Sequence, residues 1–128
     1  YRAPLNSSVR PLVMNLDELS QKIRDTSSDP VVQKIADYLT RWKETSETAE
    51  GLADAIERLI GNSWISSNQT HEQVYALWSS FRDKCIKPIA GMTMNERLYW
   101  FSLFGRFDAA QDEADRREVY AKLHAREA

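Results

Sequence analysis

The stretch TMNERLYWFSLFGRF, residues 93–107, decides the fold because it gathers the densest group of aromatic side chains in the chain. Its aromatic residues are Tyr99, Trp100, Phe101, Phe104 and Phe107. Thr93 and Glu96 have the spacing of a capping box, in which each side chain accepts a hydrogen bond from the backbone N–H of the other residue. The stretch therefore predicts a helix that begins at Thr93.

Apolar side chains would cover most of the circumference of this helix, leaving a narrow polar strip of Asn95, Ser102 and Arg106. A helix that is apolar nearly all round must be covered on more than one side, so it predicts the central helix of a bundle. Part of this surface could instead pack against another chain, because aromatic residues are enriched at the centres of interfaces. A pocket lined by these rings is the remaining alternative.

The composition indicates one globular domain. The chain has 128 residues, of which 42% are hydrophobic and 28% charged, so we expect a single helical-bundle domain over residues 14–128. The net charge of −2 disfavours nucleic acid as a partner. No apolar run is long enough to span a bilayer and no secretion signal is evident, so we expect a cytoplasmic protein without membrane association.

The N-terminal region divides at Met14. Residues 1–13, YRAPLNSSVRPLV, lack periodic apolar positions and predict a flexible arm. Because Met14 directly precedes a helix start, we expect the native protein to begin there, with residues 1–13 added or upstream sequence. Asn15 and Glu18 form a second capping box, and the first helix should end before Ser27.

The region of residues 30–60 predicts one long helix. Asp29 and Pro30 give a helix start, and apolar positions then keep their phase to Ile60, with no glycine or proline between Val31 and Glu50. Such a helix would be about 46 Å long. Alternatively, the polar residues around Thr45 and Thr48 start a separate helix.

Later segments predict further helices. Gly61 and Asn62 suit a left-handed helix end. In the following loop, Trp64 and Ile65 have two possible roles: they fold back over the preceding helix, or they form an exposed anchor for a partner. Thr70 and Gln73 predict the start of the next helix. Its apolar stripe is Val74, Leu77, Trp78, Phe81 and Cys85.

The final helix is expected over residues 112–126, with Val119, Tyr120 and Leu123 facing inward. Acidic residues stand four positions before basic ones, which predicts a solvated face of surface ion pairs. The expected pairs are Asp112 with Arg116, Glu113 with Arg117, and Glu118 with Lys122.

Residues 95–116 resemble a tail pattern of short, mostly uncharacterised bacterial proteins. The matching positions are Asn95-Glu96-Arg97-Leu98, Leu103, Phe107-Asp108-Ala109 and Asp115-Arg116. In that pattern a glycine usually stands where this chain has Ser102. The resemblance implies a bacterial origin and no particular activity.

Residues able to support catalysis are scarce. His71 and His124 each lack a glutamate three positions earlier, so no di-metal motif is present, and a single cysteine, Cys85, permits neither an intrachain disulfide nor a thiolate zinc site. No phosphate-binding glycine-rich motif is found. We therefore predict a protein that is not an enzyme and takes no cofactor or metal.

Together these features predict an all-α bundle of about five to six helices that acts as a protein-interaction module. It would bind or inhibit a protein partner, as an immunity protein, antitoxin or adaptor does, and would self-associate as a homodimer. The candidate interface residues are Trp64, Ile65, Tyr99, Trp100 and Phe104.

Two alternatives stay open. A nucleic-acid-associated regulator would use a basic stripe, formed either by Arg82, Lys84 and Lys87 or by Arg116, Arg117, Lys122 and Arg126. An enzyme would require a cleft that brings His71 or His124 to carboxylates distant in sequence.

Overall fold

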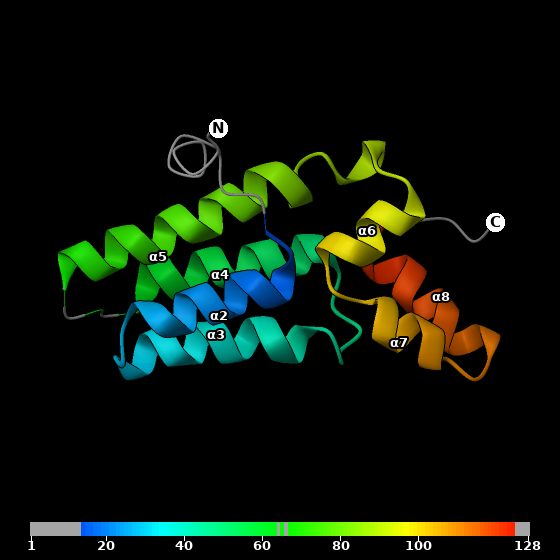
Figure 1. Ribbon diagram of the computed structural model, residues 1–128, viewed down its shortest axis with the longest axis horizontal. Coiled ribbons are helices and arrows are strands. Elements are labelled where there is room, and N and C mark those ends of the chain that lie inside the picture. The colour runs from blue at the N-terminus through cyan, green and yellow to red at the C-terminus, as the bar shows by residue number, and fades with distance from the viewer. Residues whose placement is uncertain (1–13, 64, 66, 125–128) are drawn as a thin grey trace, which may run out of the picture.

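The computed structural model describes residues 14–63, 65 and 67–124, and this part of the chain is all-helical, with no strand (Figure 1). It contains seven α-helices: α2 Leu16–Thr26, α3 Pro30–Trp42, α4 Ala49–Asn62, α5 Asn68–Phe81, α6 Met94–Trp100, α7 Phe104–Ala109 and α8 Glu113–Lys122. A π-helical turn, Arg82–Ile86, and a 3₁₀ turn, Ile89–Gly91, join α5 to α6. The predicted all-α fold is confirmed, whereas the arm predicted for residues 1–13 lies outside the described residues.

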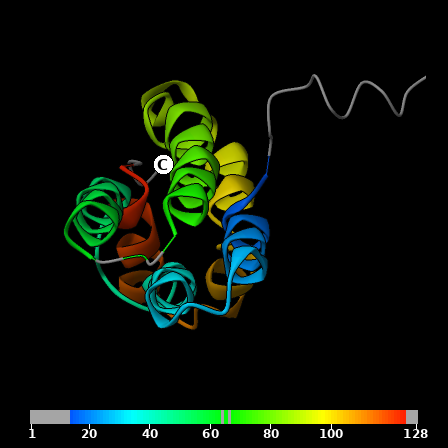
Figure 2. The same ribbon diagram turned by 90° about the vertical axis from the view of Figure 1, so that its left-hand side faces the viewer.

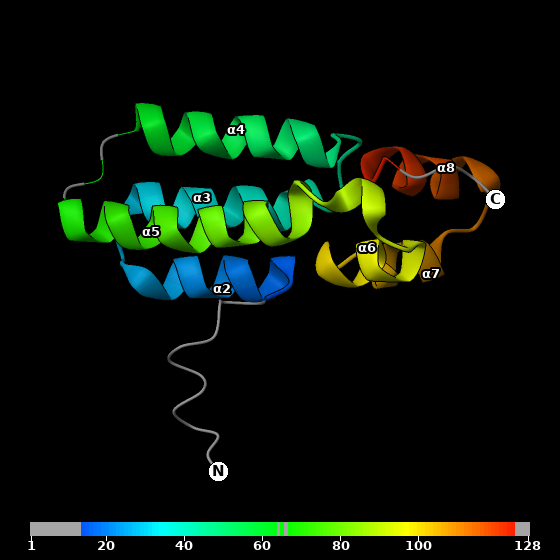
Figure 3. The same ribbon diagram turned by 90° about the horizontal axis from the view of Figure 1, so that it is seen from above.

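Helices α2 to α5 form the larger part of the fold. Seen end on, they surround a common centre (Figure 2), and α6, α7 and α8 lie beyond one end of them (Figure 3). Fully buried side chains fill that centre, among them Leu19, Ile35, Ile56 and Trp78. Trp78 lies on the apolar stripe that the sequence predicted for its helix.

Both predicted capping boxes are present. At the start of α2, the Asn15 N–H donates to Glu18 and the Glu18 N–H donates to Asn15, each over 2.9 Å. At the start of α6, the Thr93 N–H donates to Glu96 over 2.8 Å and the Glu96 N–H donates to the Thr93 hydroxyl over 3.1 Å. The bond from the Thr93 N–H lowers the pKa of Glu96.

The long helix predicted over residues 30–60 is wrong. Helix α3 ends at Trp42, and α4 begins after its N-cap Thr48, whose hydroxyl accepts from the Gly51 N–H over 3.0 Å. Residues 43–48, which we call the connector, separate the two helices. Within the connector, the Thr45 hydroxyl donates to the Trp42 carbonyl over 2.8 Å. In a continuing helix, this carbonyl would instead have accepted from a backbone N–H four residues later. The alternative reading, a separate helix started by the polar residues near Thr48, is the correct one.

The aromatic stretch is also not one central helix. Ser102 adopts a left-handed conformation with φ of 55°, and the chain turns there between α6 and α7. The Leu103 N–H donates to the Leu98 carbonyl over 2.9 Å, and the Ser102 N–H to the Tyr99 carbonyl over 3.2 Å. This is a Schellman motif, accompanied by burial of Leu98 and Leu103. The turn separates the aromatic side chains into buried and exposed groups.

Two further helix boundaries differ from the prediction. Helix α4 runs through Gly61 to Asn62, and no glycine of the described chain has a positive φ, so the predicted left-handed end is wrong. Helix α5 is capped by Ser67, whose hydroxyl accepts from the Thr70 N–H over 3.2 Å, rather than by Thr70 itself. Cys85 is buried as expected, although it lies in the π-helical turn.

The ion pairs predicted for the last helix form only in part. Glu113 bonds to Arg117 over 2.9 Å. Asp112 is instead the N-cap of α8, and the guanidinium of Arg116 lies 5.4 Å from the centroid of the Phe107 ring. Glu118 and Lys122 do not pair, because each is engaged by another part of the chain, as described below.

The left-handed turn makes a testable prediction about residue 102. A β-carbon in this conformation costs about 1–2 kcal/mol, which glycine avoids. Ser102→Ala and Ser102→Gly both lose the hydrogen bond that the Ser102 hydroxyl accepts from the Asp17 N–H, but only Ser102→Ala keeps the cost of the β-carbon. We expect Ser102→Gly to be more stable than Ser102→Ala by about 1 kcal/mol in urea denaturation. Equal stability of the two variants would contradict the left-handed turn.

Candidate functional site

The first candidate site lies at the turn between α6 and α7, where Tyr99 and Trp100 precede the turn and Phe104 follows it; we call these three residues the aromatic surface. Tyr99 is 48% exposed and Phe104 40% exposed, while Trp100 is half-buried. The rings of Tyr99 and Trp100 meet edge to face with centroids 4.8 Å apart. All three residues were candidate interface residues in the sequence, and the structure places them on two short helices that meet at one turn.

This aromatic surface stands on a fixed support. Phe101, inside the turn, is buried and contacts the rings of Trp42 and Phe81, with centroids 5.7 and 5.6 Å away. The Ser102 hydroxyl accepts from the Asp17 N–H over 3.1 Å, which joins the turn to the start of α2. The turn is therefore fixed by the buried ring of Phe101 and the hydrogen bond of Ser102, while Tyr99 and Phe104 stay exposed.

The other two candidate interface residues do not join this surface. Ile65 is 6% exposed and belongs to the hydrophobic core, so its reading as an exposed anchor is wrong and its reading as a residue folded over the bundle is correct. Trp64 lies outside the described residues. Tyr75, 37% exposed on α5, is a large exposed side chain that sequence reasoning missed. Its position beside a buried stripe gave no signal of exposure.

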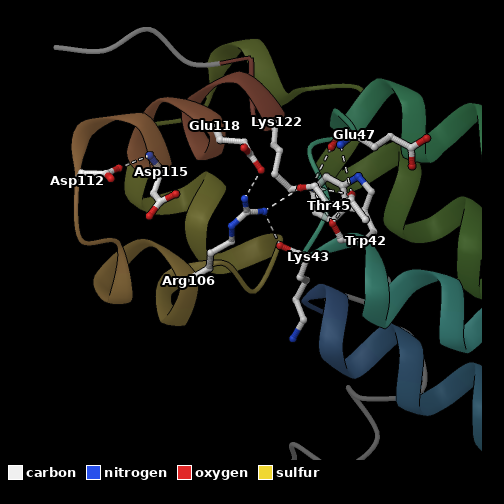
Figure 4. Close-up of polar contacts among 9 residues, drawn as sticks. All are labelled: Trp42, Lys43, Thr45, Glu47, Arg106, Asp112, Asp115, Glu118 and Lys122. Carbon is white, nitrogen blue, oxygen red and sulfur yellow. Dashed lines mark hydrogen bonds and ion pairs between the residues drawn. The ribbon is translucent and has the colours of Figure 1, made fainter.

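The second notable feature is a cluster of cations around the connector, shown in Figure 4. The side chain of Lys122 is fully buried, and its Nζ donates to the carbonyl oxygens of Trp42, Thr45 and Glu47 over 2.7, 2.8 and 2.9 Å. Nζ also lies 3.7 Å from the centroid of the Trp42 ring, a cation–π contact. The sequence had predicted a solvated surface lysine, which is wrong because the side chain turns inward and donates to these three carbonyls at the helix break.

Arg106 binds the same connector from α7. Its Nη1 donates to the carbonyl oxygens of Lys43 and Thr45, each over 2.8 Å, and its Nη2 pairs with Glu118 of α8. Two cations thus hold one connector, and Figure 4 shows both side chains directed at it. We call this arrangement the carbonyl clamp, consisting of Lys122, Arg106 and the carbonyls of residues 42–47.

The surroundings of Lys122 have two opposing effects on its pKa. Burial, together with the nearby charge of Arg106, lowers the pKa of Lys122 to about 8. The three carbonyl acceptors and the Trp42 ring favour the protonated amine. Perturbed amines can act as nucleophiles, but this one is enclosed and its donors are all engaged, so the geometry indicates a structural role.

The structure shows the surroundings of several residues on which the enzymatic and nucleic-acid alternatives depend. His124 lies 4.0 Å from Glu50, but the carboxylate side chain is 80% exposed, so this contact lies at the surface. Among the described residues, no group of three or more His, Cys, Asp or Glu side chains could hold a metal ion. Burial raises the pKa of Cys85 to about 12, which keeps the thiol protonated at neutral pH.

The proposed basic stripes are largely neutralised within the chain. Arg82 pairs with Glu57 over 2.8 Å and with Asp83 over 3.0 Å, and Lys87 pairs with Asp83 over 3.3 Å. In the second stripe, Lys122 is buried, and Arg126 lies outside the described residues. Lys84 and Arg116 are exposed and make no ion pair in the described chain, so each stripe keeps at most isolated free cations there.

Comparison with protein-family models gave no match, and comparisons with curated proteins and with solved structures gave none either. In the described part of the chain, no helix combines the length and apolar character that crossing a membrane requires.

Removing the Lys122 amine tests the clamp. Lys122→Met keeps most of the side-chain volume but removes a charged donor shared by three carbonyls. Those of Trp42 and Thr45 keep the bonds from Thr45 and Arg106, whereas the carbonyl of Glu47 loses the donor recorded for it, and an unsatisfied group costs about 1–3 kcal/mol. We expect a loss of about 2–4 kcal/mol in the free energy of unfolding measured with urea. The matched control, Lys84→Met at an exposed position, should change it by less than about 0.5 kcal/mol. A Lys122→Met protein as stable as the parent would contradict the clamp.

The lowered pKa of Lys122 predicts a pH dependence of stability. Between pH 8 and the ordinary lysine pKa of 10.5, the unfolded chain binds more protons at this position than the folded chain. The free energy of unfolding should therefore rise with pH in this window, by at most about 1.4 kcal/mol per pH unit, relative to Lys122→Met. Urea denaturation of both proteins from pH 7 to 10.5 measures the difference. A fall over the same window would mean that the carbonyl acceptors outweigh burial.

Proposed function

We propose that this protein is a small non-enzymatic interaction module whose aromatic surface binds protein, beginning with a second copy of its own chain. The observation that carries the proposal is the exposure of Tyr99 and Phe104, at 48% and 40%, beside the half-buried ring of Trp100. Tyrosine and tryptophan are the residues that most often dominate binding energy at interfaces, because they bury large areas with few rotatable bonds.

The rigid support of the aromatic surface favours binding. Phe101 and Leu103 are fully buried on either side of Ser102, so the exposed rings project from a backbone that is already ordered. Binding through a preordered surface loses less conformational entropy than binding through a mobile loop. This is the arrangement expected of an immunity protein, an antitoxin or an adaptor, and we place its action in the bacterial cytoplasm.

Non-enzymatic function is supported by how the charged side chains are used. Lys122, Arg106 and Arg97 all donate to backbone carbonyls, and Arg97 contacts those of Ala90, Met92 and Leu123. Side chains engaged in this way hold the fold and are not free to act on a substrate.

Self-association is tested by size-exclusion chromatography with light scattering. We expect the parent chain to pass from monomer to dimer as its concentration rises, and Tyr99→Ser/Phe104→Ser to stay monomeric, because the double variant removes both exposed rings. Since neither ring is buried, the variant should keep its fold, which circular dichroism checks. Tyr75→Ser, an exposed aromatic residue on α5, is the matched control and should still dimerise.

Two results would overturn this proposal. One is a parent chain that is monomeric at every concentration up to the millimolar range. The other is a dimer that persists unchanged in Tyr99→Ser/Phe104→Ser, which would place the interface elsewhere.

A further inference from the structure

Helices α6, α7 and α8 are connected to one another by their own side chains. Arg97 of α6 donates to the Leu123 carbonyl, directly after α8, over 3.0 Å. The rings of Phe107 in α7 and Tyr120 in α8 meet edge to face, with centroids 5.9 Å apart. We call these three helices and the turns that join them, residues 94–124, the cap, and we call helices α2–α5 the base. The contacts inside the cap allow it to move as one body.

Within the described residues, the chain crosses from the base to the cap only once. The cap follows the base in sequence, and residues 82–93 make the crossing. This segment contains a π-helical turn and a 3₁₀ turn instead of a continuous α-helix. The cap lies beyond one end of the base (Figure 3). Separation of the cap therefore leaves the order and the connections of the base helices unchanged.

Polar contacts between the cap and the base gather mainly at two places. At the connector, Lys122 donates to three carbonyl oxygens and Arg106 donates to two. At the start of α2, the Asp17 N–H donates to the Ser102 hydroxyl over 3.1 Å. Hydrogen bonds from a charged donor are stronger than those between neutral groups. Among the described residues, the carbonyl clamp is therefore the main polar contact that keeps the cap against the base.

Apolar burial is divided unequally between the two parts. In the cap, Phe101 contacts the rings of Trp42 and Phe81, and Leu103 and Val119 are fully buried. Most of the buried apolar side chains belong to the base, however, and α7 has no buried residue. The cap helices are also short, with 7, 6 and 10 residues, and helices of this length are unstable without tertiary contacts. Separating the cap therefore loses much less apolar burial than unfolding the whole chain.

We propose that the cap opens from the base as one cooperative unit, and that the carbonyl clamp holds it closed. Openings of this kind involve contiguous segments and cost less free energy than global unfolding. The open state frees the Lys122 amine and uncovers the rings of Trp42 and Phe81, which are buried in the closed state. The connector loses both of its cationic donors at the same time, so the joint between α3 and α4 loosens together with the cap.

Native-state hydrogen exchange of the full chain tests the opening, at a concentration where light scattering shows a monomer. Ile23 is fully buried near the end of α2, and that end lies away from the cap (Figure 3). Ile23→Val should speed the slowest amides of α3 and α5 at least twofold and leave those of α8 and the connector unchanged, because the base stays folded when the cap opens. Lys122→Met should speed both groups by the same factor, at least tenfold, because the clamp is broken in the open and the unfolded states alike.

The Lys122 amine gives a second, chemical readout. Sulfo-N-hydroxysuccinimide acetate, added at less than one label per chain, should acetylate the enclosed Lys122 only through the open state, whereas the exposed Lys84 reacts directly. Peptide mass spectrometry measures both rates. We expect Ile23→Val to leave the Lys122 rate within twofold of the parent. Arg106→Gln, which removes the other cation of the clamp, should raise the Lys122 rate at least threefold and leave the Lys84 rate unchanged.

Three results would overturn this inference. Ile23→Val could speed the amides of cap and base by the same factor, which would mean that the chain opens only as a whole. Removal of either cation could leave exchange in α8 unchanged, which would mean that the clamp does not hold the cap; Arg106→Gln decides this point if Lys122→Met is unfolded by circular dichroism. Lys122 could react as fast as Lys84, which would mean that its amine is not enclosed. None of these measurements requires self-association, so their failure is distinguishable from failure of the aromatic surface.

Discussion

The structure depends on one interaction above others, the buried ammonium group of Lys122 among the carbonyl oxygens of the connector. The break between α3 and α4 leaves backbone carbonyls without helical partners, and no left-handed glycine caps them. Lys122, 80 positions after Trp42, supplies the donors. Burying a charge is costly unless it is bonded on several sides, and here three carbonyls and an aromatic ring surround it. Helix α8 thereby fixes the course of the chain between α3 and α4.

The C-terminal helices use the same kind of contact, a cationic side chain bound to backbone carbonyls. Arg106 donates to connector carbonyls from α7, a helix without a buried residue, and Arg97 joins α6 to the end of α8 through the Leu123 carbonyl over 3.0 Å. Charged hydrogen bonds to backbone oxygen are stronger than neutral ones, so a few of them can help to orient short helices such as α7. The α6–α8 region is therefore held both by these cations and by apolar side chains such as Phe101, Leu103 and Val119 in the core.

The exposure of the aromatic surface follows from a helix break. The turn at Ser102 sends Phe101 and Leu103 into the core and leaves Tyr99 and Phe104 exposed. The connector likewise ends α3 and lets α4 turn back beside it. The binding properties proposed for the protein therefore follow from where its helices stop.

The sequence by itself determined the features that depend on near neighbours: the all-helical class, the capping boxes at Asn15 and Thr93, and buried stripes such as that of Val74 and Trp78. These depend on contacts three or four residues apart, which the local pattern records. Only the tertiary structure decided the break at the connector, the burial of Ile65 and Lys122, and the exposure of Tyr99. The physical reason is that a lysine distant in sequence satisfies the connector carbonyls, and a serine adopts the left-handed turn that glycine usually marks.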